Sequence, residues 1–290
     1  MNDASQWRYR IAQRIGELYA RNADVPAVIL GGSTARGHAD RFSDLDMGVI
    51  WDHEPSDSER HQVVRDADAE LHRLYRFDPA EQVWSDDYFI HRNQPDGTDS
   101  KLLVEVSHYK RDFVEDVLHQ VLNEHATNVL WHNLISGIVD GFSLYGDDVI
   151  TSWRNRATQY PRELSVAIVQ KYGVIDHFWR WEMYLARGDN LALFYDAFTQ
   201  IHQRLLHILL GLNKMYYFGF KWIEVIDERL SIKPDDLPMR IRSAYKSAPA
   251  EGAAHVSGLV DDVFGLIETH LPEVDTNRLR RIFHYTRPSV

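Results

Sequence analysis

The chain has no cysteine. Disulfide bonds, thiolate metal sites and cysteine nucleophiles are therefore excluded. The chain also has no run that approaches the ~20 consecutive apolar residues of a membrane-spanning helix. Its opening sequence, MNDASQWRYR, lacks the apolar stretch of a secretory signal. These absences predict a soluble, cytoplasmic protein with no membrane partner.

Four widespread enzyme motifs are missing as well. The sequence contains no G-x-x-x-x-G-K-[ST], G-x-G-x-x-G, G-x-S-x-G or H-E-x-x-H. These motifs are typical of P-loop proteins, dinucleotide-binding proteins, α/β hydrolases and zinc proteases. Their absence disfavours all four classes.

Acidic residues are in excess only in the N-terminal half. Residues 1–150 contain 27 Asp and Glu against 14 Lys and Arg, whereas residues 151–290 contain 16 against 18. The net charge of −11 argues against a long nucleic-acid partner, which requires a basic surface. It fits a metal-binding acidic half and a cationic acceptor, or simply an acidic surface that keeps the protein in solution.

The two halves also differ in predicted secondary structure. A capping box at Ser56 and Glu59 opens one helix, and the turn sequence NQPDG at 93–97 joins two strands into an antiparallel hairpin. Apolar spacing predicts strands at 25–30, 45–51, 81–91, 101–109 and 141–146. It predicts helices at 3–22, 34–39, 56–76, 112–137 (one or two), 162–187, 191–211, 217–230, 237–247 and 253–270.

We therefore predict an α+β protein of two domains. The first, residues 1–155, would have a mixed β-sheet flanked by helices and would hold the catalytic site. The second, residues 156–290, would be an all-helical bundle that closes over the substrate and nucleotide.

A glycine-rich junction follows the first predicted strand. In Gly31-Gly32-Ser33, glycines allow the backbone to approach a phosphate closely, and the following helix offers free N–H groups. Ser33 adds a hydroxyl donor. Arg36, one turn on, can hold a phosphate oxygen bidentately or can instead form a cap or an ion pair. The junction is a candidate triphosphate-binding site.

Two aspartates stand two residues apart at the start of the next strand. Asp44 and Asp46 would share one face while Leu45 and Met47 enter the core. Adjacent carboxylates repel each other, and a bound Mg²⁺ removes that penalty. A D-x-D pair can also be a solvated turn, but its spacing from the Gly-Gly-Ser junction favours a metal site.

Glu105 is the candidate third carboxylate. In 101–109, Leu102, Val104 and Val106 share one face and Glu105 lies on the other. It could be a metal ligand, the general base or both, and the alternative is an exposed strand carboxylate. Asp86 and Asp87 are the reserve candidates.

Together these residues supply the needs of nucleotidyl transfer: a triphosphate cradle, two divalent ions and a proton acceptor. The stretch GGSTARGHADRFSDLDMGV resembles the signature of the DNA polymerase β-like nucleotidyltransferase superfamily. G-S-x-A-R-G followed by S-D-L-D is similar to its small-molecule branch, which includes aminoglycoside and lincosamide nucleotidyltransferases.

The resemblance implies a mixed α/β catalytic domain followed by a helical domain. It implies Gly32 and Ser33 at the triphosphate, Asp44 and Asp46 at the metal ions and Glu105 as the third carboxylate. Ser43, which opens the S-D-L-D motif, is assigned to the nucleotide-binding set as well.

The helical half contributes two candidate cations. Lys214 and Lys221 flank aromatic residues in NKMYYFGFKW and could close over the triphosphate while tyrosines pack on the base. The alternative is an aromatic interhelical corner with extended lysines. A second aromatic segment, 171–182, is interpreted as a core helix rather than an acceptor pocket.

These observations predict a Mg²⁺-dependent nucleotidyltransferase with two metal ions. It would transfer a nucleoside monophosphate, with abundant ATP as the expected donor, to a hydroxyl of a small acceptor such as an aminoglycoside- or lincosamide-like antibiotic. The alternatives are a protein acceptor, as in antitoxin-like nucleotidyltransferases, and a nucleotide sensor that does not turn over.

Overall fold

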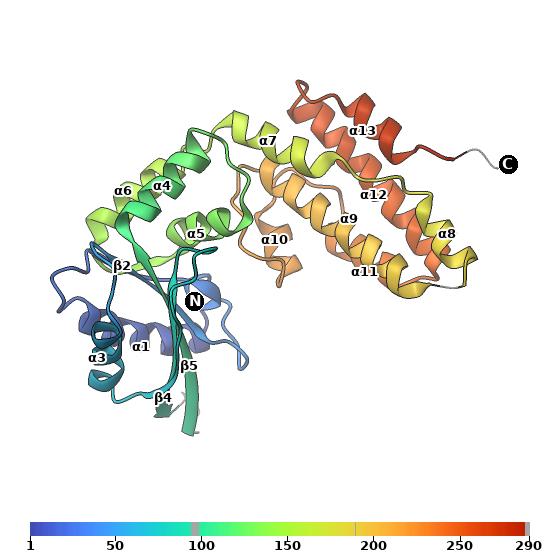
Figure 1. Ribbon diagram of the computed structural model, residues 1–290. Helices are drawn as coiled ribbons and strands as arrows, with labels where there is room; N and C mark the ends of the chain where they lie inside the picture. The colour runs from blue at the N-terminus through green and yellow to red at the C-terminus, as the bar shows by residue number, and fades with distance from the viewer. Residues whose placement is uncertain (94–98, 189, 288–290) are drawn as a thin grey trace. The chain divides into compact units, whose positions relative to one another are not determined.

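The computed structural model describes residues 1–93, 99–188 and 190–287. The chain divides into two compact units (Figure 1). The first is Met1–Glu124 with Leu130–Gln159, and the second is His125–Val129 with Tyr160–Val290. The described strands all belong to the first unit, and the second is helical, so the predicted α+β fold class is confirmed.

The described part of the chain contains strands and helices in the following order. The strands are β1 Ala27–Leu30, β2 Leu45–Trp51, β3 Glu70–Leu74, β4 Trp84–Asn93, β5 Asp99–Lys110 and β6 Phe142–Tyr145. The helices of the first unit are α1 Asp3–Tyr19, α2 Gly32–Ala35, α3 Asp57–Asp66, α4 Arg111–Leu122, α5 Val129–Asp140 (of which Val129 is grouped with the second unit) and α6 Asp147–Ala157. Those of the second unit are α7 Arg162–Gly173, α8 Arg180–Ala186, α9 Leu191–Leu212, α10 Ile223–Arg229, α11 Leu237–Lys246, α12 Pro249–His270 and α13 Thr276–Phe283.

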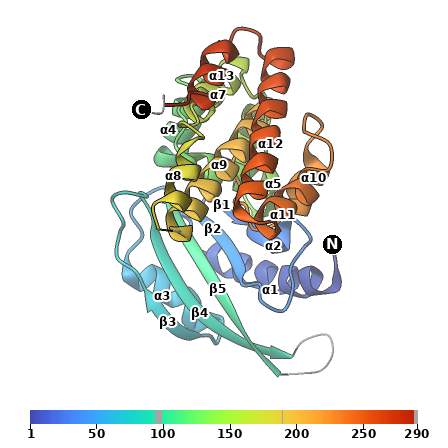
Figure 2. The same ribbon diagram turned by 90° about the vertical axis from the view of Figure 1, so that its right-hand side faces the viewer.

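The six strands form one mixed sheet in the order β3-β4-β5-β2-β1-β6. β2 and β5 are parallel, and every other neighbouring pair is antiparallel. β4 and β5 form the expected hairpin and are the longest strands of the sheet (Figure 2). The predicted turn at 93–97 lies, apart from residue 93, outside the described residues. Parallel pairing of β2 with β5 brings residues that are 59 positions apart in the sequence, such as Asp46 and Glu105, into register, and this pairing assembles the site described below.

One face of the sheet is covered by α1 and α3. Trp7, Ile11, Ile15 and Tyr19 of α1 are buried, as its apolar spacing predicts, and they share a core with inward-facing residues of β2, β4 and β5. The Ser56–Glu59 capping box is present at the start of α3. The opposite face of these three strands carries the polar side chains of β2 and β5.

The helix predicted to extend from 56 to about 76 is wrong in its second half. α3 ends at Asp66, and Asp68 adopts a positive φ of 52° that turns the chain. Residues 70–74 then form the edge strand β3, which pairs with β4. This strand is mostly exposed, so backbone pairing with β4, rather than an apolar period, determines its structure.

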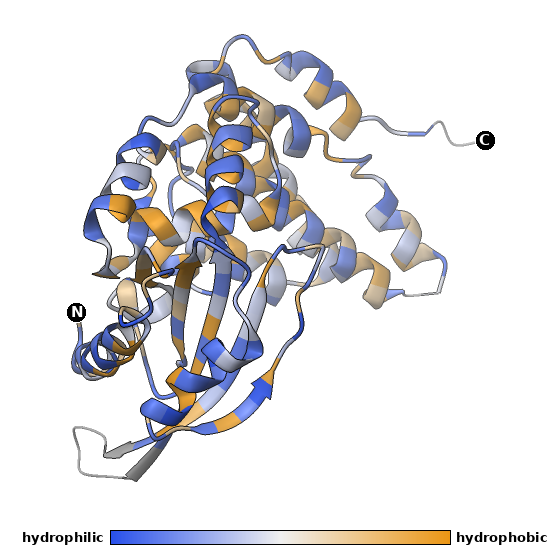
Figure 3. Ribbon diagram, turned by 60° about the vertical axis from the view of Figure 1, so that its left-hand side comes forward, coloured by the Kyte–Doolittle hydropathy of each residue, from blue (hydrophilic) through white to orange (hydrophobic). Residues whose placement is uncertain are grey.

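The second unit is built around two helices of 22 residues, α9 and α12, which share one hydrophobic core with their neighbours. Apolar and polar bands alternate along its helices, as expected of helices that bury one face (Figure 3). The predicted continuous helix at 162–187 is interrupted after Gly173, and α8 resumes at Arg180. No helix in the described ranges combines the length and apolarity needed to cross a membrane.

A charged network lies inside the core of the first unit. Arg60 of α3 pairs with Asp86 of β4, and the other carboxylate oxygen of Asp86 lies 2.8 Å from Nε2 of His108 on β5. The Trp51 indole donates to Nδ1 of His108 at 3.1 Å, which places the imidazole proton on Nε2 and directs it at Asp86. All four side chains are buried. The network therefore joins helix and sheet through a neutral histidine.

This histidine predicts a pH dependence of stability. Burial lowers the pKa of His108 below its ordinary value, although the hydrogen bond to Asp86 opposes that shift. The unfolded chain therefore binds more protons than the folded chain as the pH falls below about 6.5, and the free energy of unfolding decreases in that window. Urea denaturation on either side of it should show the decrease, and His108→Gln should show less of it. An equal slope in both proteins would contradict the assignment.

Candidate active site

Three carboxylates meet on the face of the sheet opposite α1 and α3. Asp44 directly precedes β2, Asp46 lies within β2, and Glu105 lies opposite Asp46 in the parallel register of β5. One carboxylate oxygen of each lies within 4.8 Å of the others. Two carboxylates are half-buried and Glu105 is exposed. The structure thus brings together the three acidic residues selected from the sequence.

Strand alternation explains why these side chains share a face. Leu45 and Met47 are buried against the core, and the residues flanking Glu105, Val104 and Val106, are buried as well. Successive residues of a strand point to opposite faces, so the carboxylates must project from the other side. Oxygen ligands at this spacing suit Mg²⁺, and a divalent cation would also offset their mutual repulsion.

Gly32 packs directly against Asp46. Its φ is +61°, and a Cβ at this position would lie 1.6 Å from Oδ2 of Asp46. The adjacent Gly31 N–H donates to the Asp46 carbonyl at 2.9 Å. The Gly-Gly pair therefore fixes the end of β1 against the carboxylate, and only glycine fits at position 32.

Replacement of Gly32 by alanine is expected to reduce kcat/KM for the nucleotide by roughly 10²-fold or more, because displacement of a site group by about 1 Å has effects of that size. Steady-state kinetics of the purified variant would measure the loss. Gly31→Ala is the matched control, since its Cβ would meet only the Asp46 carbonyl oxygen, at 4.0 Å, and its φ is not positive. Equal activity of the two variants would contradict the close packing described here.

Ser33 presents a hydroxyl without a protein partner. Its Oγ is buried and makes no hydrogen bond in the described part of the chain. Ser33 is the second residue of the one-turn helix α2, immediately after Gly32. A buried hydroxyl that lacks a partner can donate to a ligand oxygen. This observation fits the triphosphate role predicted for Ser33.

Two other predicted nucleotide-binding residues already have partners. Arg36 donates from Nε to Asp140 at 3.1 Å and from Nη2 to Ser136 at 3.3 Å. The Ser43 hydroxyl donates to Asp40 Oδ1 at 3.1 Å and accepts from the Asp40 N–H at 3.0 Å. Arg36 thus forms the ion pair considered as its alternative, and Ser43 stabilises its own loop.

Lys214 and Lys221 belong to the second unit and are exposed. The segment around them is the aromatic corner considered as the alternative: Tyr217 and Phe220 pack around the His207 ring, with centroids 5.0 Å from it. The Asn213 side chain bonds to both backbone groups of Ile232 at 2.8 Å and so anchors the corner. The two lysines remain candidates by charge and exposure.

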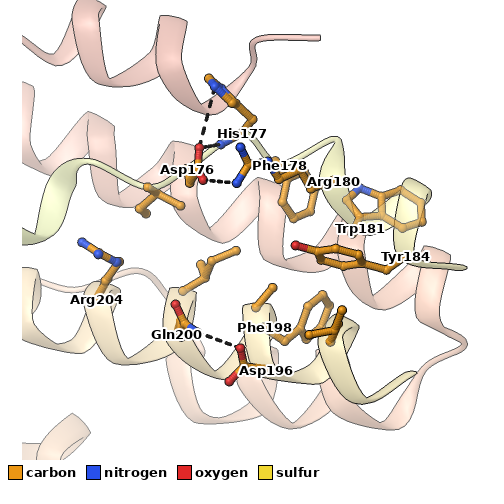
Figure 4. A pocket seen from close by; sticks show the side chains of 14 residues that line it. Asp176, His177, Phe178, Arg180, Trp181, Tyr184, Asp196, Phe198, Gln200 and Arg204 are labelled. Carbon is orange, nitrogen blue, oxygen red and sulfur yellow. Dashed lines mark hydrogen bonds and ion pairs between the residues drawn. The ribbon is translucent and has the colours of Figure 1, made fainter. Parts of the chain in front are cut away.

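The prediction of one core helix over 171–182 is wrong, because α7 ends at Gly173 and α8 begins at Arg180. Ile175, in the segment that joins α7 to α8, is buried, and together with its neighbours it lines a cavity of about 290 Å³ within the second unit (Figure 4). Aromatic rings of α8 and of the segment just before it face polar side chains of α9. The ring residues are Phe178, Trp181 and Tyr184, and the polar ones are Asp196, Gln200 and Arg204.

The two reserve carboxylates point to opposite faces of β4. Asp86 is buried in the network with Arg60 and His108, so its selection as a metal-ligand candidate is wrong. Asp87 pairs in register with Glu105 and accepts from the Tyr75 hydroxyl at 3.0 Å. It therefore lies on the same face as the three carboxylates, one strand away from Glu105.

Arg8 was not selected from the sequence, yet it contacts the residue that precedes the carboxylates. Its guanidinium is buried and donates to the carbonyl of Ser43, the residue before Asp44. The signal was present in the sequence, because Arg8 occupies the apolar stripe of α1 together with Ala12, Ile15 and Tyr19. An arginine inside an apolar stripe needs polar partners, and these come from a loop distant in sequence.

Comparison with known families decides the class of this site. Residues 9–117, which include the three carboxylates, match a family model described as a nucleotidyltransferase domain. The first unit carries a nucleotidyltransferase domain. The enzyme class predicted from the sequence, a nucleotidyltransferase, is therefore confirmed. The match supports the predicted superfamily, and its small-molecule branch stays a prediction. Such domains transfer a nucleoside monophosphate from a nucleoside triphosphate.

The other comparisons add less. Residues 127–223 match a domain of unknown function, DUF4037. No curated protein matches the sequence. A solved nucleotidyltransferase-like protein from Exiguobacterium sibiricum 255-15 is 14% identical, with 92% of this chain and 80% of that chain covered and a TM-score of 0.37.

Proposed function

We propose that this nucleotidyltransferase transfers a nucleoside monophosphate to a hydroxyl of a small-molecule acceptor, in a Mg²⁺-dependent reaction with ATP as the preferred donor. The observation that carries the proposal is the convergence of Asp44, Asp46 and Glu105 within the matched nucleotidyltransferase domain. A cytoplasmic location, where ATP and Mg²⁺ are abundant, fits this chemistry.

Asp44, Asp46 and Glu105 would hold two Mg²⁺ ions. The fit is chemical as well as geometric, since all three offer carboxylate oxygens, which hard divalent cations prefer. When bound, the ions supply charge stabilisation to the attacking and leaving oxygens of an in-line displacement. The three carboxylates would determine the positions of the two ions and therefore of their positive charge.

Glu105 is our choice for the proton acceptor. The acceptor hydroxyl attacks the α-phosphorus, a new oxygen–phosphorus bond forms, and the bond to the bridging oxygen of pyrophosphate breaks. The hydroxyl proton must leave as the bond forms, and Glu105 is the exposed member of the three, so a bound acceptor can reach it. Glu105 would serve as a metal ligand, as the base or in both roles.

The leaving pyrophosphate would be held by the backbone at Gly32 and by the unpartnered Ser33 hydroxyl. To direct its Nε at a phosphate oxygen, Arg36 would have to break its ion pair with Asp140. We propose that Lys214 and Lys221 of the helical unit add positive charge to the triphosphate. Ser43 is not retained as a ligand, because its hydroxyl is already bonded within the loop.

A small acceptor is supported by the size and lining of the cavity in the helical unit. A volume of about 290 Å³ lies at the lower limit of small-molecule sites, and an aromatic wall with a few polar groups is the lining that such sites have. The excess of acidic residues in the first 150 positions favours a cationic acceptor. Aminoglycoside-like and lincosamide-like compounds are cations that bear hydroxyl groups, and they are the first acceptors to test.

An acceptor screen tests this proposal. Purified chain would be incubated with Mg²⁺, each of the four nucleoside triphosphates and a panel of aminoglycosides, lincosamides and neutral polyols, and every product would be identified by mass spectrometry. A nucleotide adduct on one acceptor class names the substrate. An adduct found only on a co-purified protein would instead favour the protein-acceptor alternative, and tight nucleotide binding without any product would favour a sensor.

A further inference from the structure

Within the described residues, the hydrogen bonds of the buried Arg8 side chain all go to backbone carbonyl groups. Its Nε and Nη2 both donate to the Ser43 carbonyl, at 3.2 and 2.8 Å, and Nη2 also donates to the Asp40 carbonyl at 2.8 Å. Nη1 donates to Ala4 within α1 at 3.2 Å. The side chain is 6% exposed. One guanidinium thus ties the first helix to both ends of the segment 40–43.

Other contacts from the same helix hold the preceding residues but stop short of Ser43. Asn2 donates to the Ala39 carbonyl at 2.9 Å, and the Ser5 hydroxyl accepts from the Ala39 N–H at 3.0 Å. Arg8 continues this row one turn further along α1, since positions 2, 5 and 8 share a face. Among the described contacts from α1, only those of Arg8 reach the residue that precedes Asp44.

The segment that Arg8 holds has no regular secondary structure of its own. Residues 40–44 form a turn between α2 and β2, and Phe42 within it is exposed. The Ser43 carbonyl belongs to the peptide bond whose other half is the Asp44 N–H. Fixing that carbonyl at two points therefore restricts the rotation that would swing the Asp44 side chain away from Asp46.

The position of the charge supports the same role. Burial lowers the pKa of Arg8, while Asp40 and Asp44 raise it, which means that both carboxylates interact electrostatically with the guanidinium. A buried cation is costly unless hydrogen bonds and nearby negative charge compensate for it. Asp40 and Asp44 therefore supply part of that compensation.

We propose that Arg8 is a positioning residue of the transfer site: it fixes the peptide that precedes Asp44 and so holds this carboxylate in place to share a cation with Asp46 and Glu105. This inference rests on the proposed metal-dependent function. It assigns Arg8 no contact with nucleotide or acceptor.

Direct Mn²⁺ binding separates positioning from a general structural role. Titration followed by electron paramagnetic resonance should show that Arg8→Met binds Mn²⁺ at least about ten-fold more weakly than the wild type, as loss of a residue that orients a metal ligand does. Removal of a nearby positive charge alone would act in the opposite direction and tighten cation binding to the acidic site. Weaker binding therefore reports on the lost orientation.

The controls use the same helix and the same site. Arg10→Met replaces an exposed arginine of α1 and should bind Mn²⁺ like the wild type. Arg8→Lys keeps a donor and should recover part of the affinity if it folds. Circular dichroism of each variant would establish that it is folded, and a variant that is unfolded would be replaced by Arg8→Gln, which retains an amide donor.

The outcomes are distinct. Weaker binding by folded Arg8→Met or Arg8→Gln, but not by Arg10→Met, supports the inference. Unchanged or tighter binding by the folded Arg8 variants overturns it while leaving the proposed function intact. If the wild-type chain binds no Mn²⁺ and its titration is the same as that of Asp44→Asn, the proposed metal centre is wrong. The inference about Arg8 then fails with it.

Discussion

Asp46→Asn is expected to reduce the turnover number by at least roughly 10³-fold, because the metal ions contribute several kcal/mol of transition-state stabilisation and each ~1.4 kcal/mol is a factor of ten. Asp46 is the central member of the three carboxylates: it lies opposite Glu105 in the sheet register and is two residues from Asp44 on the same face. Asparagine preserves the shape but removes the negative charge. Asp44→Asn should behave in the same way.

The loss should be specific to the site rather than to the fold. Asp46 packs beside Gly32 on the face away from the core, so asparagine leaves the packing of Leu45 and Met47 intact. Asp52→Asn is the matched control, because Asp52 directly follows the same strand and is exposed beside Arg111. Pyrophosphate release should be lost in the Asp46 variant and retained in the Asp52 variant. Near-normal release by Asp46→Asn would remove the basis of the mechanism.

Asp86→Asn is expected to have the largest effect on stability, with a decrease of about 3 kcal/mol in the free energy of unfolding, since removing one partner leaves a buried charge uncompensated. Asp86 is fully buried and bonds to Arg60 and His108 at once. Arg60 retains Asp57 at 2.7 Å, but that carboxylate is exposed and compensates only part of the loss.

The neighbouring residue supplies a sharp control. Asp87 lies next to Asp86 in β4 but on the solvent-accessible face, so Asp87→Asn should change stability by no more than about 0.5 kcal/mol. Urea denaturation of both variants would measure the difference. Adding Arg60→Met to Asp86→Asn should recover part of the loss, because the uncompensated cation is then absent. Equal stability of the Asp86 and Asp87 variants would contradict a structural role for the network.

Elements whose structure is determined locally could be predicted from the sequence. The strand at 45–51 has the predicted bounds because apolar residues alternate with Asp46 and Gly48, and the start of α3 follows from the Ser56–Glu59 capping box. The same alternation placed Asp44, Asp46 and Glu105 on the face away from the core, and the parallel register of β2 and β5 then makes them neighbours.

Features that depend on distant contacts were missed. The edge strand β3 is largely exposed and is defined by its pairing with β4, which no local apolar pattern reveals. The sequence pattern does not distinguish Asp86 from Asp87. Only the buried partners of Asp86, Arg60 and His108, do so. Arg8 is similar: its role depends on carbonyl groups more than 30 residues away. Hydrogen bonds between distant segments leave little trace in local periodicity.

The most direct test of nucleotidyl transfer follows the α-phosphate. ATP labelled at the α-phosphorus would be incubated with the chain, Mg²⁺ and the acceptor identified by the screen, and the products would be separated. We expect the label to move to the acceptor, unlabelled pyrophosphate to be released in equal amount, and both events to disappear in Asp46→Asn. Label recovered as free AMP or ADP, with none on an acceptor, would show hydrolysis of ATP and would contradict nucleotidyl transfer by this chain.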